Sequence, residues 1–361
     1  MAYIYKTYSS GGTNNQKKFT ASVWVKRCAT GVQHEIASAY KASNGFQTDL
    51  LKFNSDDTLR FYSHSDSGQG ATSFITNAKF RDTSAWYHIV LNVDTTQSTE
   101  SERFKMWVNG EQITSWSTST YPAQNNSMIW GMPTDAVHQI GALNGSNGFN
   151  GLMSHFHYVQ NANHAPTVFG ETDSTTGEWK INTSPSVTYS DQSFWFFKDD
   201  NLPTDRSGNG NNWSTSGTLT KTEDNPSNVF ATFNPLDNYY PAMTLSNGNT
   251  KALTITNKYT YTPTTLGMTS GKYYAEIKCT AQSGSQNAMV IGITSTSSGS
   301  TTEELGHSEN DYGYYADNGN YRNNDTNNSY GSSFTTGDII GIAIDLDNNK
   351  LYFSKNGTWQ N

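Results

Sequence analysis

A segment rich in tyrosine and asparagine near the end of the sequence carries side chains that could bind a ligand. Tyr presents a large flat ring at small entropic cost, and Asn and Asp can hydrogen-bond sugar hydroxyls or peptide groups. We expect exposed rings here to stack on sugar faces, and the Arg to bind the carboxylate of an acidic sugar. Alternating Tyr in a strand also fits a buried core, so both interpretations stay open. The candidate ligand-binding residues are Tyr312, Tyr314, Tyr315, Asn318, Tyr321 and Arg322.

Two other clusters contain residue types that bind metals. Asp199, Asp200 and Asp205 bring hard oxygen atoms together on one predicted loop, which suits Ca²⁺. Their spacing matches no EF-hand loop, and turn-forming Asp explains the cluster without an ion. His155 and His157 alternate on a predicted strand, so both rings share a face with the spacing that a metal pair could use. Because no third ligand is evident nearby, we interpret them as partly exposed strand histidines.

β-strands must position these residues, because apolar side chains recur with a period of two along much of the chain. In residues 19–26 the apolar side chains share one face, and Trp24 points the other way. Asn109 and Gly110 tolerate positive φ and predict a tight hairpin turn. No window shows sustained helical periodicity. Further strands are predicted at 59–62, 86–93, 104–108, 112–114, 149–159, 193–197, 271–278, 290–293 and 339–346.

Length and composition predict two all-β domains. A chain of 361 residues is too long for one comfortable core and fits two. Only 15% of residues are charged, whereas 21 Tyr, 17 Phe and 9 Trp favour pleated, half-buried surfaces over helices. We predict two antiparallel β-sandwiches in tandem, at 1–212 and 213–361, with a polar linker segment ending the first.

Charge and cysteine content exclude several classes of function. A net charge of −8 opposes nucleic-acid binding, which needs clustered Lys and Arg to displace counterions from phosphate. Cys28 and Cys279 lie in different predicted domains, so they predict neither a disulfide framework nor a Cys-based zinc site. The N-terminus lacks the apolar core of a signal peptide, and no apolar run is long enough to span a bilayer. We expect no nucleic-acid partner, no membrane insertion and no Sec-type secretion.

Specific motifs lie in both halves of the chain. The first half contains FTASVWVKR (19–27), DDTLRFY (56–62), WYHIVLNVD (86–94), WVNG (107–110), the strand at 149–159 and DRSGNGNNW (205–213). It resembles the concanavalin A-like lectin family in its laminin-G-type form, as found in structural proteins of marine bacteriophages. The second half contains GKYYAEI (271–277), IGI (291–293), GDIIGIAIDL (337–346) and LYFSKNGTW (351–359), and it resembles the SPRY, or B30.2, domain.

The resemblance implies two jelly-roll, concanavalin A-like sandwiches in a non-catalytic virion protein, of the tail-fibre or head-fibre type, exposed on the particle. Its implied partners are host-surface polysaccharide and other virion proteins. Fibre-like appendages multiply weak sugar contacts, so we expect a homo-oligomer, a trimer. A purely structural decoration protein that packs on other virion subunits is the alternative.

The resemblance also bears on particular residues. It assigns the tyrosine-rich segment to the SPRY ligand face, and Ca²⁺ to many laminin-G-type domains. A SPRY domain usually continues for several strands after the KNGTW hairpin, whereas this sequence stops at Asn361. We therefore expect a longer protein, or further strands supplied by another chain.

A glycoside hydrolase of the same fold is a third possibility. Such enzymes carry E-x-D-x-x-E on one strand, and the nearest counterpart begins with Glu171 and Asp173. The final position holds Thr176, Glu178 is displaced by about 7 Å along a strand, and Gly177 disfavours a regular strand. We interpret this stretch as a polar linker and expect no catalytic residues.

Overall fold

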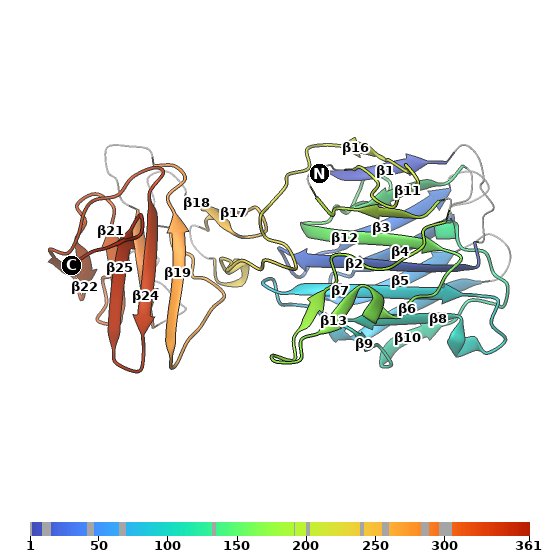
Figure 1. Ribbon diagram of the computed structural model, residues 1–361, viewed down its shortest axis with the longest axis horizontal. Coiled ribbons are helices and arrows are strands. Elements are labelled where there is room, and N and C mark those ends of the chain that lie inside the picture. The colour runs from blue at the N-terminus through green and yellow to red at the C-terminus, as the bar shows by residue number, and fades with distance from the viewer. Residues whose placement is uncertain are drawn as a thin grey trace. The chain divides into compact units, whose positions relative to one another are not determined.

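The computed structural model describes residues 2–8, 16–41, 47–64, 70–131, 135–190, 192–199, 203–238, 242–254, 260–282, 289–295 and 305–361 (Figure 1). The chain forms two compact units, Met1–Phe230 and Ala231–Asn361, each with its own core. Paired strands in both units run antiparallel, and the helical turns of the described residues are short 3-10 segments. The all-β prediction is therefore confirmed. None of the helices in those ranges is long and apolar enough to cross a membrane.

The first unit consists of two sheets around one core and a separate hairpin. The eight-stranded sheet has the order β10 (Trp116–Thr120), β6 (Ala71–Lys79), β5 (Thr58–His64), β4 (Gln47–Phe53), β3 (His34–Lys41), β11 (Val137–Ile140), β1 (Tyr3–Thr7) and β16 (Ser214–Ser216). The six-stranded sheet has the order β15 (Phe194–Phe196), β12 (Gly151–Gln160), β2 (Lys18–Arg27), β7 (Trp86–Asp94), β8 (Phe104–Val108) and β9 (Glu111–Gln112). The hairpin pairs β13 (Gly170–Thr172) with β14 (Trp179–Ile181).

The period-two pattern places side chains as predicted in β2 and β7. Alternate residues of β2 from Phe19 to Val25 belong to the core, and Trp24 lies on the opposite face, stacked on His88 of β7 with ring centroids 4.6 Å apart. The predicted tight turn between β8 and β9 is also present. Asn109 and Gly110 adopt φ values of 50° and 82°, which Asn and Gly reach at low steric cost.

The structure places the boundary between the units later than the predicted 212/213. Trp213 packs in the first core, and β16 pairs with β1 at the sheet edge. Asp224 binds the buried Lys26 ammonium at 2.6 Å and accepts a hydrogen bond from Trp86 Nε1 at 3.0 Å. These contacts hold residues 213–230 on the first unit.

The second unit contains two four-stranded sheets whose inward faces share a core. One sheet has the order β19 (Lys272–Lys278), β24 (Ile339–Asp345), β25 (Lys350–Lys355) and β26 (Thr358–Trp359). The other has the order β20 (Val290–Thr294), β21 (Asp311–Tyr315), β22 (Tyr321–Asn323) and β23 (Thr326–Asn328). A further hairpin pairs β17 (Thr244–Ser246) with β18 (Lys251–Leu253). The core consists of Cys279, Ile291, Tyr314, Ala316, Phe334, Ile340, Ile342 and Phe353.

Candidate functional site

Tyr314 of β21, one of the candidate ligand-binding residues, is a core residue. Its side chain is 0% exposed and stacks with Phe334 and Phe353, whose ring centroids lie 5.4 and 5.2 Å away. Its hydroxyl donates to the carbonyl of Ser332 at 2.5 Å. The strand register puts Tyr314 opposite Ile291, which is also buried in this core. Of the two interpretations that the sequence left open, the buried core applies to Tyr314, because its position on the strand faces inward, so Tyr314 is not part of a ligand surface.

Arg322 is held in place by groups of its own domain. Its Nη1 atom donates to the Tyr315 hydroxyl at 3.3 Å, and that hydroxyl donates to the carbonyl of Leu305 at 3.0 Å. The guanidinium also forms an ion pair with Asp325. The charge of Arg322 is therefore already offset, and an acidic sugar would have to compete with Asp325 for it.

The other tyrosines and Asn318 remain closer to solvent. Tyr312 is 38% exposed, and Asn318 is exposed in the turn after β21, where its Oδ1 accepts a hydrogen bond from the Asn320 N–H. Tyr321 is half-buried and meets Tyr330 edge-on. Alternation along β21 and β22 distributes the five candidates on these strands over both faces of the sheet, and Asn318 lies in the turn between them, so the six do not form one surface. The ligand role of the accessible ones stays a prediction.

The loop predicted to bind Ca²⁺ uses its carboxylates for its own hydrogen bonds. Asp205 accepts from the N–H groups of Trp195, Ser207 and Asn211 at 2.8–2.9 Å and from the Ser207 hydroxyl at 2.7 Å. Asp199 forms an ion pair with Arg206 at 2.7 Å. The third candidate, Asp200, lies outside the described residues. In the ranges described, no three His, Cys, Asp or Glu side chains are grouped closely enough to hold a metal ion.

His155 and His157 are buried, not partly exposed as predicted. A bulge in β12 gives His155 a φ of 47°, and the two ring centroids lie 6.4 Å apart. Tyr189 contacts His157 through a 2.6 Å hydrogen bond at Nδ1, and Trp195 covers its ring at 4.7 Å. Burial lowers the pKa of His155 to about 4 and that of His157 well below its usual range. Both rings are neutral parts of a covered sheet face.

The carboxylate-rich stretch forms the β13–β14 hairpin, not the polar linker that the sequence indicated. Glu171 and Glu178 are exposed, and the turn between the strands is closed by Asp173, which binds the Lys180 ammonium at 2.5 Å. Neither Glu side chain is enclosed in a site that would hold a sugar bond between two carboxyl groups.

Trp179 anchors this hairpin to the six-stranded sheet. Its Nε1 atom donates to Nδ1 of His88 at 3.0 Å. Its ring lies directly on the backbone at Gly110 and Gly170, where an added Cβ would come within 2.5 and 2.7 Å of the indole. The hairpin thereby covers the face that carries Trp24 and His88.

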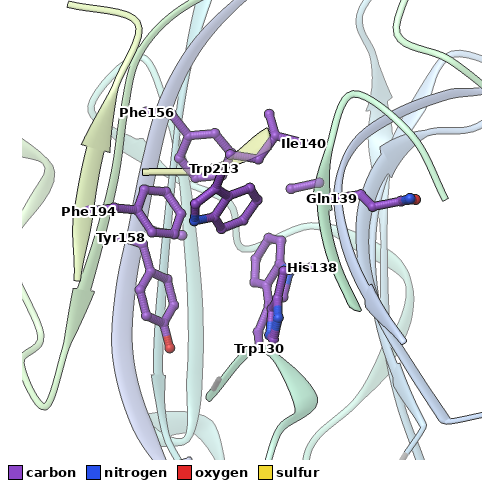
Figure 2. Close-up of a pocket in the computed structure, with 10 residues that line it drawn as sticks. Trp130, His138, Gln139, Ile140, Phe156, Tyr158, Phe194 and Trp213 are labelled. Carbon is purple, nitrogen blue, oxygen red and sulfur yellow. The ribbon is translucent and has the colours of Figure 1, made fainter. Parts of the chain in front are cut away.

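An interior cavity lies between the two sheets of the first unit (Figure 2). Its volume is about 10 Å³, which corresponds to room for about one water molecule. Figure 2 shows Trp213 between Phe194 and His138, and the ring centroids of these neighbours lie 5.0 and 6.4 Å from it. This cavity is too small to hold a sugar.

A set of exposed aromatic side chains in the second unit was missed by the sequence analysis. Tyr274, Tyr352 and Trp359 are 55%, 46% and 56% exposed on the sheet of β19, β24, β25 and β26, and Trp359 contacts both tyrosines. All three belong to motifs that the sequence analysis used only for fold. In the sequence, Tyr274 and Tyr352 alternate with residues that face the core, and this pattern is the signal that could have identified an outward-facing set.

Comparison with known families agrees with the motifs in both units. Residues 3–169 match the model of the concanavalin A-like lectin/glucanases superfamily, and residues 272–361 match the SPRY domain model. The chain thus carries a concanavalin A-like domain followed by a SPRY domain.

Ran-binding protein 9 from Danio rerio is 37% identical over 89 residues, which are 24% of this chain and 14% of that protein. The Ran-binding proteins 9/10 homolog of Drosophila melanogaster is 34% identical over 88 residues, 24% of this chain and 9% of its own length. The chain therefore spans a small part of these relatives.

Solved structures with similar folds have low sequence identity. A protein from Bacteroides ovatus ATCC 8483 is 17% identical, with a TM-score of 0.35, over 62% of this chain and 58% of its own. The heptameric SAP-like pentraxin from Limulus polyphemus is 13% identical, with a TM-score of 0.31, over 46% of this chain and 79% of its own.

Proposed function

We propose that this protein is a non-catalytic glycan-binding protein and part of a bacteriophage appendage that attaches to host-surface polysaccharide. The main support is the match of residues 3–169 to a superfamily whose description joins lectins with glucanases. Lectins bind sugars and glucanases cleave them, so the arrangement of carboxyl groups decides between the two activities.

Two carboxyl groups of the first unit, Asp49 and Asp224, are unsuited to glycoside cleavage because they are buried. Glycoside hydrolysis uses two carboxyl groups that flank the sugar bond, about 5–10 Å apart and open to substrate. The Asp224 carboxylate is buried against Lys26. Burial raises the pKa of Asp49 to about 6, as in a general acid, but Asp49 is 0% exposed and accepts a hydrogen bond from the Trp130 N–H at 2.7 Å. A substrate cannot reach a carboxyl group inside the core.

The bacteriophage assignment is supported by the motifs of the first half, which resemble structural proteins of marine phages. In such an appendage the chain is exposed on the particle, contacts other virion proteins and works as a trimer, because several weak sugar sites together give useful avidity. No cofactor is required for this binding role.

A glycan array probed with the full chain, together with antibody labelling of phage particles, tests this function. We expect saturable binding to a defined set of glycans and labelling of tail or head fibres. Labelled fibres with no glycan binding would support the purely structural decoration role instead. Absence of the chain from the particles would contradict the virion assignment while leaving glycan binding intact.

A further inference from the structure

The outward face of the sheet formed by β19, β24, β25 and β26 presents an aromatic surface that the known domain matches do not explain. Tyr274, Tyr352 and Trp359 are each about half exposed. Trp359 meets both tyrosines nearly at right angles, with ring centroids 6.2 Å from Tyr274 and 6.4 Å from Tyr352. We call these three residues the aromatic platform. Large aromatic side chains in contact on a solvent-exposed face indicate a binding surface.

The strand register explains how the platform forms. Residues that pair across adjacent strands form two neighbouring rows on the sheet. One row consists of Glu276, Gly341, Ser354 and Trp359, and the other consists of Tyr274, Ala343 and Tyr352. Residues opposite each other on antiparallel strands share a face, so both rows point away from the core. On this face β24 carries only the small residues Gly341 and Ala343, and the aromatic residues lie on the strands to either side of it, β19, β25 and β26.

Gly341 allows Tyr274 to lie flat against β24. A Cβ at residue 341 would come within 2.6 Å of the Tyr274 hydroxyl and within 2.3 Å of Ser354 Oγ. The Tyr274 hydroxyl donates to Glu276 at 2.8 Å, and this hydrogen bond raises the pKa of Tyr274. The ring is therefore fixed over the small residues with a carboxylate at its edge.

This combination of groups fits a sugar. The apolar face of a pyranose carries C–H bonds that pack on the negative face of an aromatic ring, and its hydroxyls need hydrogen-bond acceptors and donors at the ring edge. The platform supplies the rings, and the exposed Glu276 carboxylate, together with the Tyr274 hydroxyl that donates to it, supplies the polar partners. An apolar protein surface at this face would bury the charged Glu276 carboxylate, which is exposed in this structure, and such burial is unfavourable.

Charge narrows the class of sugar. Glu276 is exposed beside the platform, whereas the nearby Lys272 ammonium forms an ion pair with Asp345 at 3.1 Å. A carboxylate at the site repels uronic or sialic acids and accepts hydrogen bonds from neutral or amino sugars. This preference is opposite to that expected for Arg322, so the two candidate surfaces can be told apart by ligand charge.

We propose that the aromatic platform, with Glu276 at its edge, is a binding site for neutral or amino sugars of a host polysaccharide, an assignment that rests on the proposed glycan-binding function. Residues of the SPRY domain thereby add a second sugar-contacting surface to a chain whose lectin-type match lies in the other unit.

Titration of the full chain with hexasaccharides tests the platform. The probes are cellohexaose, chitohexaose, the glucosamine hexamer and, as the acidic comparator, hexagalacturonate. We expect the protein to bind at least one neutral or amino probe at least 10-fold more tightly than hexagalacturonate. Trp359→Ala and Tyr352→Ala should each weaken that binding at least 10-fold. Because both side chains are about half exposed, thermal unfolding should stay unchanged.

Tyr273→Ala is the matched control. Tyr273 lies on the same strand and is 46% exposed, but the register places it on the opposite face, so its loss should change binding less than twofold. Unchanged binding in the Trp359 and Tyr352 variants would overturn the platform and leave the glycan-binding function standing. Preferred binding of hexagalacturonate, lost on Arg322→Ala, would overturn it in favour of Arg322. No binding of any glycan by the unaltered chain would reject the proposed function itself.

Discussion

Replacing His88 by Gln should change how the stability of the first unit depends on pH. His88 is 0% exposed on β7 and is stacked on Trp24. Its Nδ1 accepts from Trp179 Nε1 at 3.0 Å, and an indole N–H can only donate, so the imidazole proton lies on Nε2 and is donated to Ser22 Oγ at 2.8 Å. Burial lowers the pKa of His88 from 6.5 to about 3.

The size and sign of the effect follow from proton linkage. The unfolded chain binds a proton at His88 near pH 6.5, and the folded chain does so only near pH 3. The contribution of this group is therefore complete above about pH 6.5 and is lost as the pH falls. Each pKa unit corresponds to about 1.4 kcal/mol, so lowering the pH from 6.5 to 4.5 removes about 3 kcal/mol. At neutral pH, Gln can still donate to Ser22 but leaves the Trp179 N–H without an acceptor, which costs about 1–3 kcal/mol.

Urea unfolding followed by tryptophan fluorescence measures this difference. Of the nine Trp, only Trp359 lies beyond residue 230, so the signal reports mainly on the first unit. The free energy of unfolding of His88→Gln relative to that of the unaltered protein should rise by about 3 kcal/mol between pH 7.5 and 4.5, so that the deficit of the variant disappears or reverses. His307→Gln, at a half-buried residue of the second unit, should leave this curve unchanged. A deficit that is the same at both pH values would refute the assignment of His88 as a buried neutral ring.

Three further predictions concern stability and assembly. Asp49, with a pKa raised to about 6 by burial, stabilises the fold most below about pH 4 and loses that contribution as the pH rises. Asp49→Asn should therefore gain about 3 kcal/mol over the unaltered protein at pH 8 and little at pH 4 in urea unfolding, whereas an equal effect at both would contradict the shift. Asp224→Ala leaves the Lys26 ammonium buried without its partner and should destabilise the first unit by roughly 3–5 kcal/mol in calorimetry; a loss below about 1 kcal/mol would show that the ion pair is dispensable. Light scattering of the full-length protein should give a trimer, and a monomer there would count against the appendage model.

Local patterns predicted the strands and the faces of several of them. The period of two in β2 correctly separated the core residues from Trp24, because neighbours in the sequence determine which face a side chain occupies. The Asn109-Gly110 turn was predictable for the same reason, since positive φ is a property of these residue types.

The structural features that could not be predicted from the sequence depend on contacts between residues far apart in the chain. Tyr314 is buried because Phe334 and Phe353 stack on it from later parts of the chain. The β13–β14 hairpin depends on Trp179 meeting Gly110 and His88. The aromatic platform likewise exists only in the register that aligns β19, β25 and β26, which no single motif reveals.

The most direct test of glycan binding without catalysis uses a hexasaccharide to which the full chain binds on a glycan array. Calorimetric titration measures its binding, and mass spectrometry of the same sample then measures the length of the hexasaccharide. The predicted result is saturable binding together with an oligosaccharide of unchanged length after prolonged incubation. A hexasaccharide that is shortened by the protein, and no longer shortened by the Glu171→Gln variant, would contradict the non-catalytic assignment and make the protein a glycoside hydrolase.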